Sequence, residues 1–398
     1  MDRVMPSGGL PTDRGWASAT VVGHNKDVLL VSENFGAGHT RAAEALARGI
    51  GEADAGIRVH MVELGRELRP QMNQALLYSY LGMIRKAPNL WRKVYGRHHG
   101  RSFPRWIEWC LYHSLYSSLS EYIQRFQPRL VVSTHPFASS GIARLKREGT
   151  PLLLCTVITD FAAHGSWVNP EVDLYLVPHH GVKDQLIWMG VKPGRIAVTG
   201  IPADNRFWEE KDKTETRLRL GLKPMPTVLI LGGGLGVGRT SDMVRTAAKW
   251  KDHLQLVVCT GHNEKLRESF LQCEELKHPH VHITGFTREI ADWMDAADII
   301  LSKPGGMTCT EAIAKGKPLL LFGSIPGHEE KNSHFMEEQG LAVRVSDEEE
   351  LDGWFHRLLT DEHCFDRVRE QMLTWRWKIH PSRSVSAVLH LLEPSTAR

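Results

Sequence analysis

The chain has 398 residues, of which 42% are hydrophobic and 24% charged, and its formal net charge is +3. This length is too great for one ordinary hydrophobic core and fits two domains, and the composition excludes an intrinsically disordered chain. No apolar run is long enough to span a membrane and the six cysteines form no C-x-x-C pair, so we expect a cytoplasmic protein with reduced cysteines that is neither secreted nor integral to a membrane.

The chain begins with a stretch for which no fold is expected. Residues 1–26 are rich in Gly, Pro and Ser and have no apolar signal-peptide core, so we expect a mobile tail. The apolar run Asp27–Ser32 then predicts a buried strand, followed by the loop ENFGAGH and an alanine-rich helix over Arg41–Ile50. His39 falls where this helix begins. The glycines of the loop could serve only a tight turn, as in many doubly wound sheets.

A strongly basic segment follows a second predicted strand, Ile57–Leu64. Between Leu68 and Ile107 there are eight Lys or Arg residues and no Asp or Glu, and aromatic residues are interleaved with these cations. This composition favours binding to an anionic membrane, although a nucleic-acid surface or a solvated helical hairpin would look similar. The residues expected to bind the membrane are Arg85, Lys86, Trp91, Arg92, Lys93, Arg97 and Trp106.

Polar residues follow the ends of the remaining strands of the first domain. Those strands are expected at Leu130–Thr134, Leu152–Thr159, Leu174–Val177 and Ile196–Thr199. Because parallel strands end at one edge of a sheet, His39, His135 and Asp160 are expected to share a cleft, with His39 as a candidate general base. Each of the three could instead make only structural hydrogen bonds.

A second α/β domain follows the charged run Trp208–Arg219, which we interpret as the bridge between domains. Its strands are expected at Thr227–Leu231, Leu256–Cys259, Val281–Ile283, Ile299–Leu301, Pro318–Phe322 and Ala342–Val345, with closing helices at Asp347–Leu359 and Ser384–Leu392. The expected division is a tail at 1–26, an N-terminal domain at 27–205, a linker at 206–222, a C-terminal domain at 223–375 and a final helical segment at 376–398.

Two strand-to-helix junctions between Leu301 and Phe335 are suited to a phosphate-bearing ligand. A Pro-Gly-Gly turn leads into a helix expected to open at Thr308, with Glu311 one turn inside it, and a second helix follows Gly327. Helix N-termini present free N–H groups and the positive end of a dipole. Gly305, Gly306 and Thr308 could therefore donate to a diphosphate, Glu311 could accept from a ribose, and Glu329 and Asn332 could bind a sugar. Glu311 alone could equally be a first-turn carboxylate favoured by the helix dipole.

Six stretches in order carry a resemblance to a known family. They are SENFGAGHTRAAEAL, VITDFAAHGSWVNPEVDLYLVP, GIPADNRF, LILGGGLGVG, GFTREIADWMDAADIILSKPGGMTCTEAIAKGKPLLL and PGHEEKNSHF. Together they resemble the monogalactosyldiacylglycerol synthase and processive diacylglycerol glucosyltransferase family of glycosyltransferase family 28. The resemblance implies a GT-B fold, with two Rossmann-like doubly wound domains, a cleft between them and a C-terminal helix that crosses back to the first domain.

The resemblance also implies an activity. The family transfers a hexose from a UDP-sugar to the hydroxyl of a membrane lipid such as diacylglycerol, with inversion and without an obligatory metal or cofactor. The expected partners are a UDP-sugar, a lipid acceptor and the anionic inner face of the cell membrane, with no nucleic acid. Left open are a UDP-sugar epimerase of the same architecture, a soluble acceptor, and a non-catalytic membrane-bound sensor of sugar nucleotides.

Residue roles follow from the same resemblance. His39 and Asp160 match the catalytic positions, and His135, His164 and Trp167 are expected on the acceptor side. The donor-binding residues are expected to be Gly234, Gly236, Phe286, Thr287, Gly305, Gly306, Met307, Thr308, Glu311, Glu329 and Asn332. Two departures stand out: Ala37 lies between the loop glycines, and His328 stands where the family commonly has Gln. The choice among glucose, galactose and an N-acetylated sugar therefore stays open.

Overall fold

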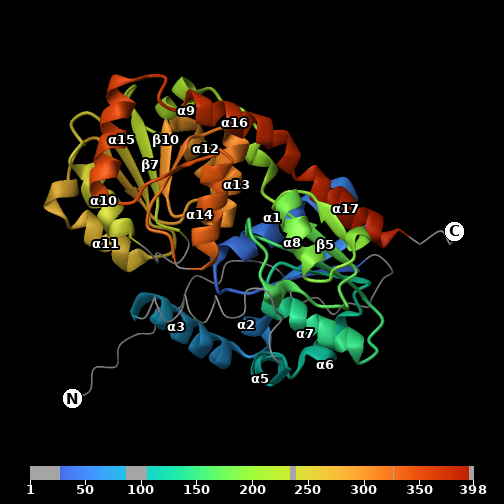
Figure 1. Cartoon of the computed structure of the whole chain (residues 1–398). Coiled ribbons are helices and arrows are strands. Elements are labelled where there is room, and N and C mark those ends of the chain that lie inside the picture. Colours follow the sequence, from blue (N-terminus) through green and yellow to red (C-terminus); the bar gives the residue numbers. More distant parts are fainter. Residues whose placement is uncertain (1–26, 87–104, 234–238, 326, 394–398) are drawn as a thin grey trace, which may run out of the picture.

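The computed structural model describes residues 27–86, 105–233, 239–325 and 327–393. It contains two α/β domains, each built on a six-stranded parallel sheet with helices on both faces (Figure 1). The N-terminal sheet has the strand order β2-β1-β3-β4-β5-β6 and the C-terminal sheet the order β12-β11-β10-β7-β8-β9. The two doubly wound domains expected from the sequence are therefore confirmed.

All the strands predicted from apolar runs are present, with ends that differ by no more than two residues. The N-terminal strands are β1 (Asp27–Ser32), β2 (Arg58–Glu63), β3 (Leu130–Ser133), β4 (Leu153–Val157), β5 (Leu174–Val177) and β6 (Ile196–Val198). The C-terminal strands are β7 (Thr227–Leu231), β8 (Gln255–Cys259), β9 (Val281–Thr284), β10 (Ile299–Ser302), β11 (Leu319–Leu321) and β12 (Val343–Arg344). Every residue of β1, β3, β7 and β10 is buried, because helices cover both faces of these central strands.

Helices connect the strands and form the outer layers. In the N-terminal domain they are α1 (Ala37–Ala53), α2 (Leu64–Leu68), α3 (Pro70–Lys86), α5 (Arg105–Leu115), α6 (Leu119–Phe126), α7 (Pro136–Arg147), η1 (Gly165–Trp167), α8 (His180–Trp188), η2 (Pro193–Arg195) and η3 (Asn205–Phe207). In the C-terminal part they are α9 (Lys213–Arg219), α10 (Thr240–Ala248), α11 (Glu264–Leu271), η4 (Glu274–Leu276), α12 (Ile290–Ala296), α13 (Gly306–Lys315), α14 (His328–Glu338), α15 (Glu348–Thr360), α16 (Asp366–Arg376), η5 (Trp377–Ile379) and α17 (Ser382–Leu392). Within the described ranges, no helix is long and apolar enough to cross a membrane.

In each sheet the strand order reverses beside the first strand of its domain. β1 lies between β2 and β3, and β7 lies between β8 and β10, so successive connections leave each of these strands in opposite directions. Open α/β sheets bind ligands in the crevice at such switch points, outside the carboxyl ends of the strands. The two crevices lie on facing edges of the domains, and the loops after β1, β3, β7 and β10 therefore define the place for a site.

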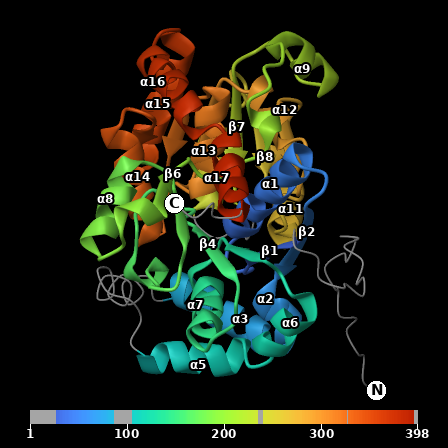
Figure 2. The same ribbon diagram turned by 90° about the vertical axis from the view of Figure 1, so that its right-hand side faces the viewer.

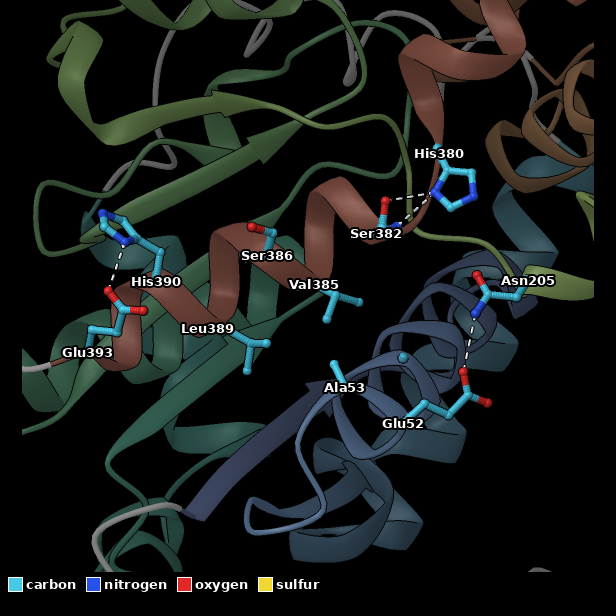
Figure 3. A pocket seen from close by; sticks show the side chains of 11 residues that line it. Glu52, Ala53, Asn205, His380, Ser382, Val385, Ser386, Leu389, His390 and Glu393 are labelled. Atoms are coloured by element: carbon cyan, nitrogen blue, oxygen red, sulfur yellow. Dashed lines mark hydrogen bonds and ion pairs between the residues drawn. The ribbon is translucent and has the colours of Figure 1, made fainter.

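The final helix crosses back to the N-terminal domain, as expected. Figure 1 shows α16 and α17 running along one side of the molecule, from the second sheet to the first. Val385 and Val388 of α17 belong to the same hydrophobic cluster as β1 and α1. A Cβ on Gly49 of α1 would lie 2.7 Å from Val385 Cγ2, so α17 approaches α1 closely at this glycine. Beyond that contact, a hollow of about 800 Å³ opens between the two helices (Figure 3), bordered by Glu52 and Leu389.

The expected linker, 206–222, contains a helix that is fixed to the C-terminal domain. Arg217 of α9 donates to Asp298 (2.6 Å), and Lys211 and Arg219 both pair with Asp292 (2.6 Å). The charges of the run Trp208–Arg219 thus meet carboxylates of α12 and the residues after it, which the sequence pattern did not indicate. The helix α16 was likewise not predicted.

Candidate active site

His39 lies in the first turn of α1, directly after the loop that follows β1. Its Nδ1 is 2.8 Å from the Thr134 carbonyl oxygen after β3 and 2.8 Å from Thr159 Oγ1 after β4. A carbonyl oxygen can only accept, so Nδ1 carries the proton and Nε2 keeps its lone pair. Burial lowers the pKa of His39 below its ordinary 6.5, and the nearby Asp160 carboxylate partly opposes that shift. The side chain is therefore a neutral imidazole with a basic Nε2, which is the form that a general base requires.

An aromatic wall surrounds His39 on the N-terminal side. The ring of His135 lies edge-on to His39 at 4.6 Å, and Trp167 lies 6.3 Å away. Phe35 stacks on His135 at 5.7 Å. Because His135 Nδ1 accepts from Phe137 N (3.2 Å), its ring caps α7, and burial holds the pKa of His135 well below its usual range. His135 and Trp167 are thus brought to the cleft, as predicted.

His164 has a structural role in the same region. Its Nδ1 accepts from Ser166 N at 3.2 Å, so it caps the short helix η1. Asp160 follows β4 and accepts from Asn332 Nδ2 of the C-terminal domain at 3.0 Å. His39 and Asp160 therefore share the cleft, and the contact to Asn332 shows that the cleft is closed by both domains.

Glu311 is buried at the interface between the domains, with 1% of its surface exposed. Arg41 of α1 donates to its Oε1, while Oε2 is buried and has no hydrogen-bond partner among the described residues. Burial raises the pKa of Glu311, and Arg41 opposes this rise. An unpaired buried carboxylate oxygen is costly, and it is an acceptor suited to a ligand hydroxyl.

The helix that carries Glu311 begins earlier than predicted. We expected it to open at Thr308, but α13 starts at Gly306, with Gly305 as its N-cap, and its first turn has no acidic residue. The prediction was wrong by two residues because the Pro-Gly-Gly turn closes immediately and Cys309 N already donates to Gly305 O (3.0 Å). Glu311 therefore lies in the second turn, so its interpretation as a first-turn carboxylate favoured by the dipole is also wrong.

The loop glycines allow the two domains to approach each other. A Cβ on Gly306 would lie 2.1 Å from the Thr159 carbonyl oxygen, and one on Gly38 would lie 3.4 Å from Met307 Cγ. The first turn of α13, which also contains Thr308, thus sits against the first turn of α1. The free N–H groups at this helix start and His39 consequently face the same space.

Lys303 is a cation in the cleft that sequence reasoning missed. It directly follows β10 and donates to Glu329 Oε1 at 2.6 Å, while Ile325 N donates to Glu329 Oε2 at 2.8 Å. Its Cε lies 2.8 Å from the position of a Cβ on Gly233, which has a φ of +73° and is the second residue of the glycine loop after β7. The signal was present in the sequence, because a lysine at the end of a switch-point strand is placed to meet an anion.

A stacked pair of rings lies at the ends of β8 and β9. Phe286 is 54% exposed and stacks on His262 at 4.3 Å, with 13° between the ring planes. Thr287 Oγ1 accepts from Glu289 N at 3.0 Å and so shapes the turn before α12. This platform could hold a flat base, and His262 was not predicted. Gly234 and Gly236 lie outside the described residues.

The predicted membrane-binding residues fall mostly outside the described part of the chain. Trp91, Arg92, Lys93 and Arg97 lie there entirely, and Arg85 and Lys86 are described only as the last residues of α3. Trp106 is on α5 and 68% exposed. Trp109 of the same helix, another of the aromatic residues interleaved with the cations, is 55% exposed. Figure 2 shows α5 at the end of the molecule opposite α15 and α16.

Comparisons with known proteins match both halves of the chain. Residues 39–203 match the family model of monogalactosyldiacylglycerol (MGDG) synthase, and residues 227–364 match the glycosyltransferase family 28 C-terminal domain. A processive diacylglycerol beta-glucosyltransferase of Bacillus licheniformis is 29% identical over 374 residues, which are 92% of this chain and 94% of the relative. A probable chloroplastic monogalactosyldiacylglycerol synthase 2 of Oryza sativa subsp. indica is 31% identical over 369 residues, which cover 86% of this chain and 75% of the relative.

Solved structures share the fold. Anabaena HepE in complex with UDP-glucose has a TM-score of 0.58 at 12% identity, covering 92% of this chain and 99% of HepE. UDP-GlcNAc 2-epimerase from Neisseria meningitidis, bound to UDP-GlcNAc, has a TM-score of 0.56 at 15% identity, covering 92% and 100%. The family resemblance and the GT-B fold expected from the sequence are thereby confirmed.

Proposed function

Because this chain belongs to the monogalactosyldiacylglycerol synthase family of glycosyltransferases, we propose that it transfers a hexose from a UDP-sugar to a hydroxyl of diacylglycerol. The names of the bacterial and plant relatives support the lipid acceptor. The observation that carries the proposal is the contact between the first turns of α1 and α13, where Met307 lies against Gly38, next to His39. This contact puts a neutral base beside a helix start that is suited to a diphosphate.

The donor would extend across the C-terminal edge of the cleft. The rings of His262 and Phe286 would stack on the base, and Glu311 Oε2 would accept from a ribose hydroxyl. The amides of Gly306, Met307 and Thr308 would donate to the diphosphate, with Lys303 beside them. Glu329, which Lys303 holds in place through an ion pair, would bind hydroxyls of the sugar.

The acceptor would approach from the aromatic wall. His39 Nε2 would take the proton of the acceptor hydroxyl as its oxygen forms a bond to the anomeric carbon and the bond from that carbon to UDP breaks. Attack from the face opposite UDP inverts the anomeric carbon. The negative charge that develops on UDP would be stabilised by the helix N-terminus and Lys303. These two positive groups support transfer without a metal, and activity that survives a chelator is the expected result.

The proposed setting is the inner face of the cell membrane. Trp106 and Trp109 are exposed three residues apart on α5, so both rings lie on one side of the helix. Tyr78 of α3, which packs on α5, is 65% exposed. Aromatic rings beside lysines and arginines suit the headgroup region of an anionic bilayer.

One assay tests the function. UDP release is measured with UDP-glucose, UDP-galactose and UDP-GlcNAc, each with and without diacylglycerol in anionic vesicles. We expect release only when diacylglycerol and one preferred sugar are both present. Conversion of the UDP-sugar without an acceptor would indicate an epimerase instead, release that depends on a soluble acceptor would contradict the lipid substrate, and binding of UDP-sugar and vesicles with no release would indicate a sensor.

A further inference from the structure

Asn332 of α14 is fully buried, and its side-chain amide is committed to protein partners. Nδ2 donates to Asp160 Oδ1 at 3.0 Å and to the Pro304 carbonyl oxygen at 3.1 Å. Oδ1 accepts from Phe161 N at 2.8 Å. Both amide protons are used, and the oxygen is engaged as well. Asn332 was predicted to bind the sugar, but in this closed arrangement it has no proton left to donate to one.

Two of these partners belong to the other domain. Asp160 and Phe161 follow β4 of the N-terminal sheet, whereas Asn332 and Pro304 belong to the C-terminal domain. We propose that Asn332 is a positioning residue that fixes the Asp160 carboxylate beside His39 when the domains close. The proposal rests on the proposed transfer reaction, in which His39 is the base.

The segment Thr159–Phe161 is held from both sides. At one end Thr159 Oγ1 contacts His39 Nδ1 at 2.8 Å, and at the other Asn332 bonds the side chain of Asp160 and the backbone of Phe161. The Phe161 ring also stacks on Phe335, one turn after Asn332 on α14, at 4.9 Å with 11° between the planes. α14 therefore holds this segment through hydrogen bonds of the Asn332 amide and through the ring of Phe335.

The position of Asp160 matters because of its effect on His39. Its carboxylate raises the pKa of His39 against the effect of burial, and two other titratable groups face the ring, His135 after β3 and His328 at the start of α14. With Asn332 in place, one hydrogen bond fixes the direction of the Asp160 carboxylate. Without it, the carboxylate is free to turn away and its field at His39 weakens.

Three variants test this role. Asn332→Ala removes the amide, Asn332→Asp keeps its shape but adds a charge next to Asp160, and Ser333→Ala is the matched control. Ser333 is buried on the same helix and its hydroxyl has no hydrogen-bond partner in the described structure, so its loss should change nothing. Thermal unfolding of each variant shows whether it is folded, and Asn332→Asp serves if the alanine variant is not.

We expect kcat of Asn332→Ala to fall by at least about tenfold, because a displaced Asp160 carboxylate no longer stabilises the positive charge that forms on His39 when it takes the proton. The affinities for UDP and for the UDP-sugar, measured by calorimetry, should stay within about twofold of the wild type. The acid limb of the pH profile should move to lower pH in Asn332→Ala, since His39 loses the raising effect of Asp160. It should move to higher pH in Asn332→Asp, since added negative charge favours the protonated imidazole.

A purely structural role would not move the two acid limbs in opposite directions. Loss of affinity for the UDP-sugar but not for UDP, with an unchanged pH profile, would overturn the proposal and make Asn332 a sugar ligand. The pKa of His39 is also measured by NMR in the free protein, with the resonance assigned from its absence in His39→Gln. That measurement needs no turnover. If the wild type transfers no sugar, the proposed function is wrong. If the pKa of His39 is unchanged in Asn332→Ala, the positioning role of Asn332 is wrong.

Discussion

Arg41 on α1 and Glu311 on α13 form an ion pair that joins the two domains. The arginine is two residues from His39, and the carboxylate is one that the sequence assigns to the ribose. Only one carboxylate oxygen is paired with the guanidinium, and the other is buried without a partner among the described residues. Arg41 thus pairs with one oxygen of a buried acid and opposes the rise of its pKa, while the other oxygen stays available to a ligand.

Removal of this acid should weaken binding of the nucleotide. Glu311→Ala is expected to lower the affinity for UDP by about 10- to 100-fold, because a hydrogen bond to a charged group contributes roughly 1.5–3 kcal/mol. Arg41→Ala should lower the affinity for UDP only a few-fold. This loss of affinity should grow as the pH falls, since the pKa of Glu311 rises further without the cation. Calorimetry with UDP measures both. Arg48→Ala is the control, since Arg48 lies on the same helix but pairs with Asp204; unchanged affinity in Glu311→Ala would remove the ribose role.

His39 should separate transfer from binding. His39→Ala is expected to lower kcat by about 10²- to 10⁴-fold, the usual contribution of a general base, while the affinity for UDP is retained. In the wild type, activity should fall as the pH drops through the pKa of His39, which lies below its ordinary 6.5, because the protonated ring cannot accept a proton. Rates and calorimetric affinities are compared over pH. Equal losses of rate and UDP affinity would mean that His39 is not the base.

The elements of both sheets could be predicted because buried parallel strands are continuous apolar runs between turns. β1 and β5 have the predicted ends, and the residues after the strands, such as His39 and Asp160, reach the cleft by topology alone. The start of α13 was misplaced, since a pattern of residue types does not show which amide closes the first helical hydrogen bond.

Contacts between the domains could not be predicted. Arg41 and Glu311 are 270 residues apart, and Asp160 and Asn332 are 172 apart. Nothing in either local sequence specifies the partner, because these pairs depend on how the two sheets are placed relative to each other. Lys303 is different, because its position after β10 could be predicted from the sequence, whereas its pairing with Glu329 could not.

Gly306 should be required for the domains to close. In Gly306→Ala the new Cβ would lie 2.1 Å from the Thr159 carbonyl oxygen, a backbone atom that cannot yield without opening the cleft. We expect kcat to fall by about 100-fold while UDP still binds to the C-terminal domain, and small-angle scattering should show a larger radius of gyration. Gly353→Ala is the control, because no atom lies within 4 Å of its Cβ on α15; it should leave activity intact and stabilise the helix by about 0.5–1 kcal/mol. Normal turnover in Gly306→Ala would show that closure at this point is not needed.

The two tryptophans of α5 should contribute to membrane binding. The double variant Trp106→Ala and Trp109→Ala is expected to bind anionic vesicles at least about tenfold more weakly, as each buried ring contributes on the order of 1 kcal/mol or more. Co-sedimentation with vesicles at several salt concentrations measures this. Trp188→Ala is the matched control, because Trp188 is 77% exposed on α8, a helix that is not part of the basic segment in the sequence. The same loss of vesicle binding in both variants would indicate nonspecific binding by exposed aromatic rings rather than a defined membrane-binding surface.

Glu33 should make the N-terminal domain less stable as the pH rises. Its buried carboxyl accepts from Tyr116 Oη (2.6 Å) and Gly65 N (3.1 Å), and burial raises its pKa from 4.5 to about 8. Between these values the native protein keeps a proton that the unfolded chain releases. The free energy of unfolding therefore falls by about 1.4 kcal/mol per pH unit across this window. Glu33→Gln has no such proton, and it keeps an acceptor for both donors.

The expected result for Glu33→Gln is a flatter curve of stability against pH, measured by chemical denaturation, and a gain on the order of 3 kcal/mol near neutral pH. Asn73 Oδ1 is a buried acceptor without a partner in the described structure. It and Glu33 Oε2 both lie within 2.9 Å of the Cβ position of Gly65, so the new amide N–H can also reach Asn73 Oδ1. Glu67→Gln on α2 controls for the loss of a carboxylate, since Glu67 is exposed and its replacement should leave the slope unchanged. Parallel curves for the wild type and Glu33→Gln would contradict this prediction. They would show that Glu33 is already ionised in the folded protein and does not cause the pH dependence of stability.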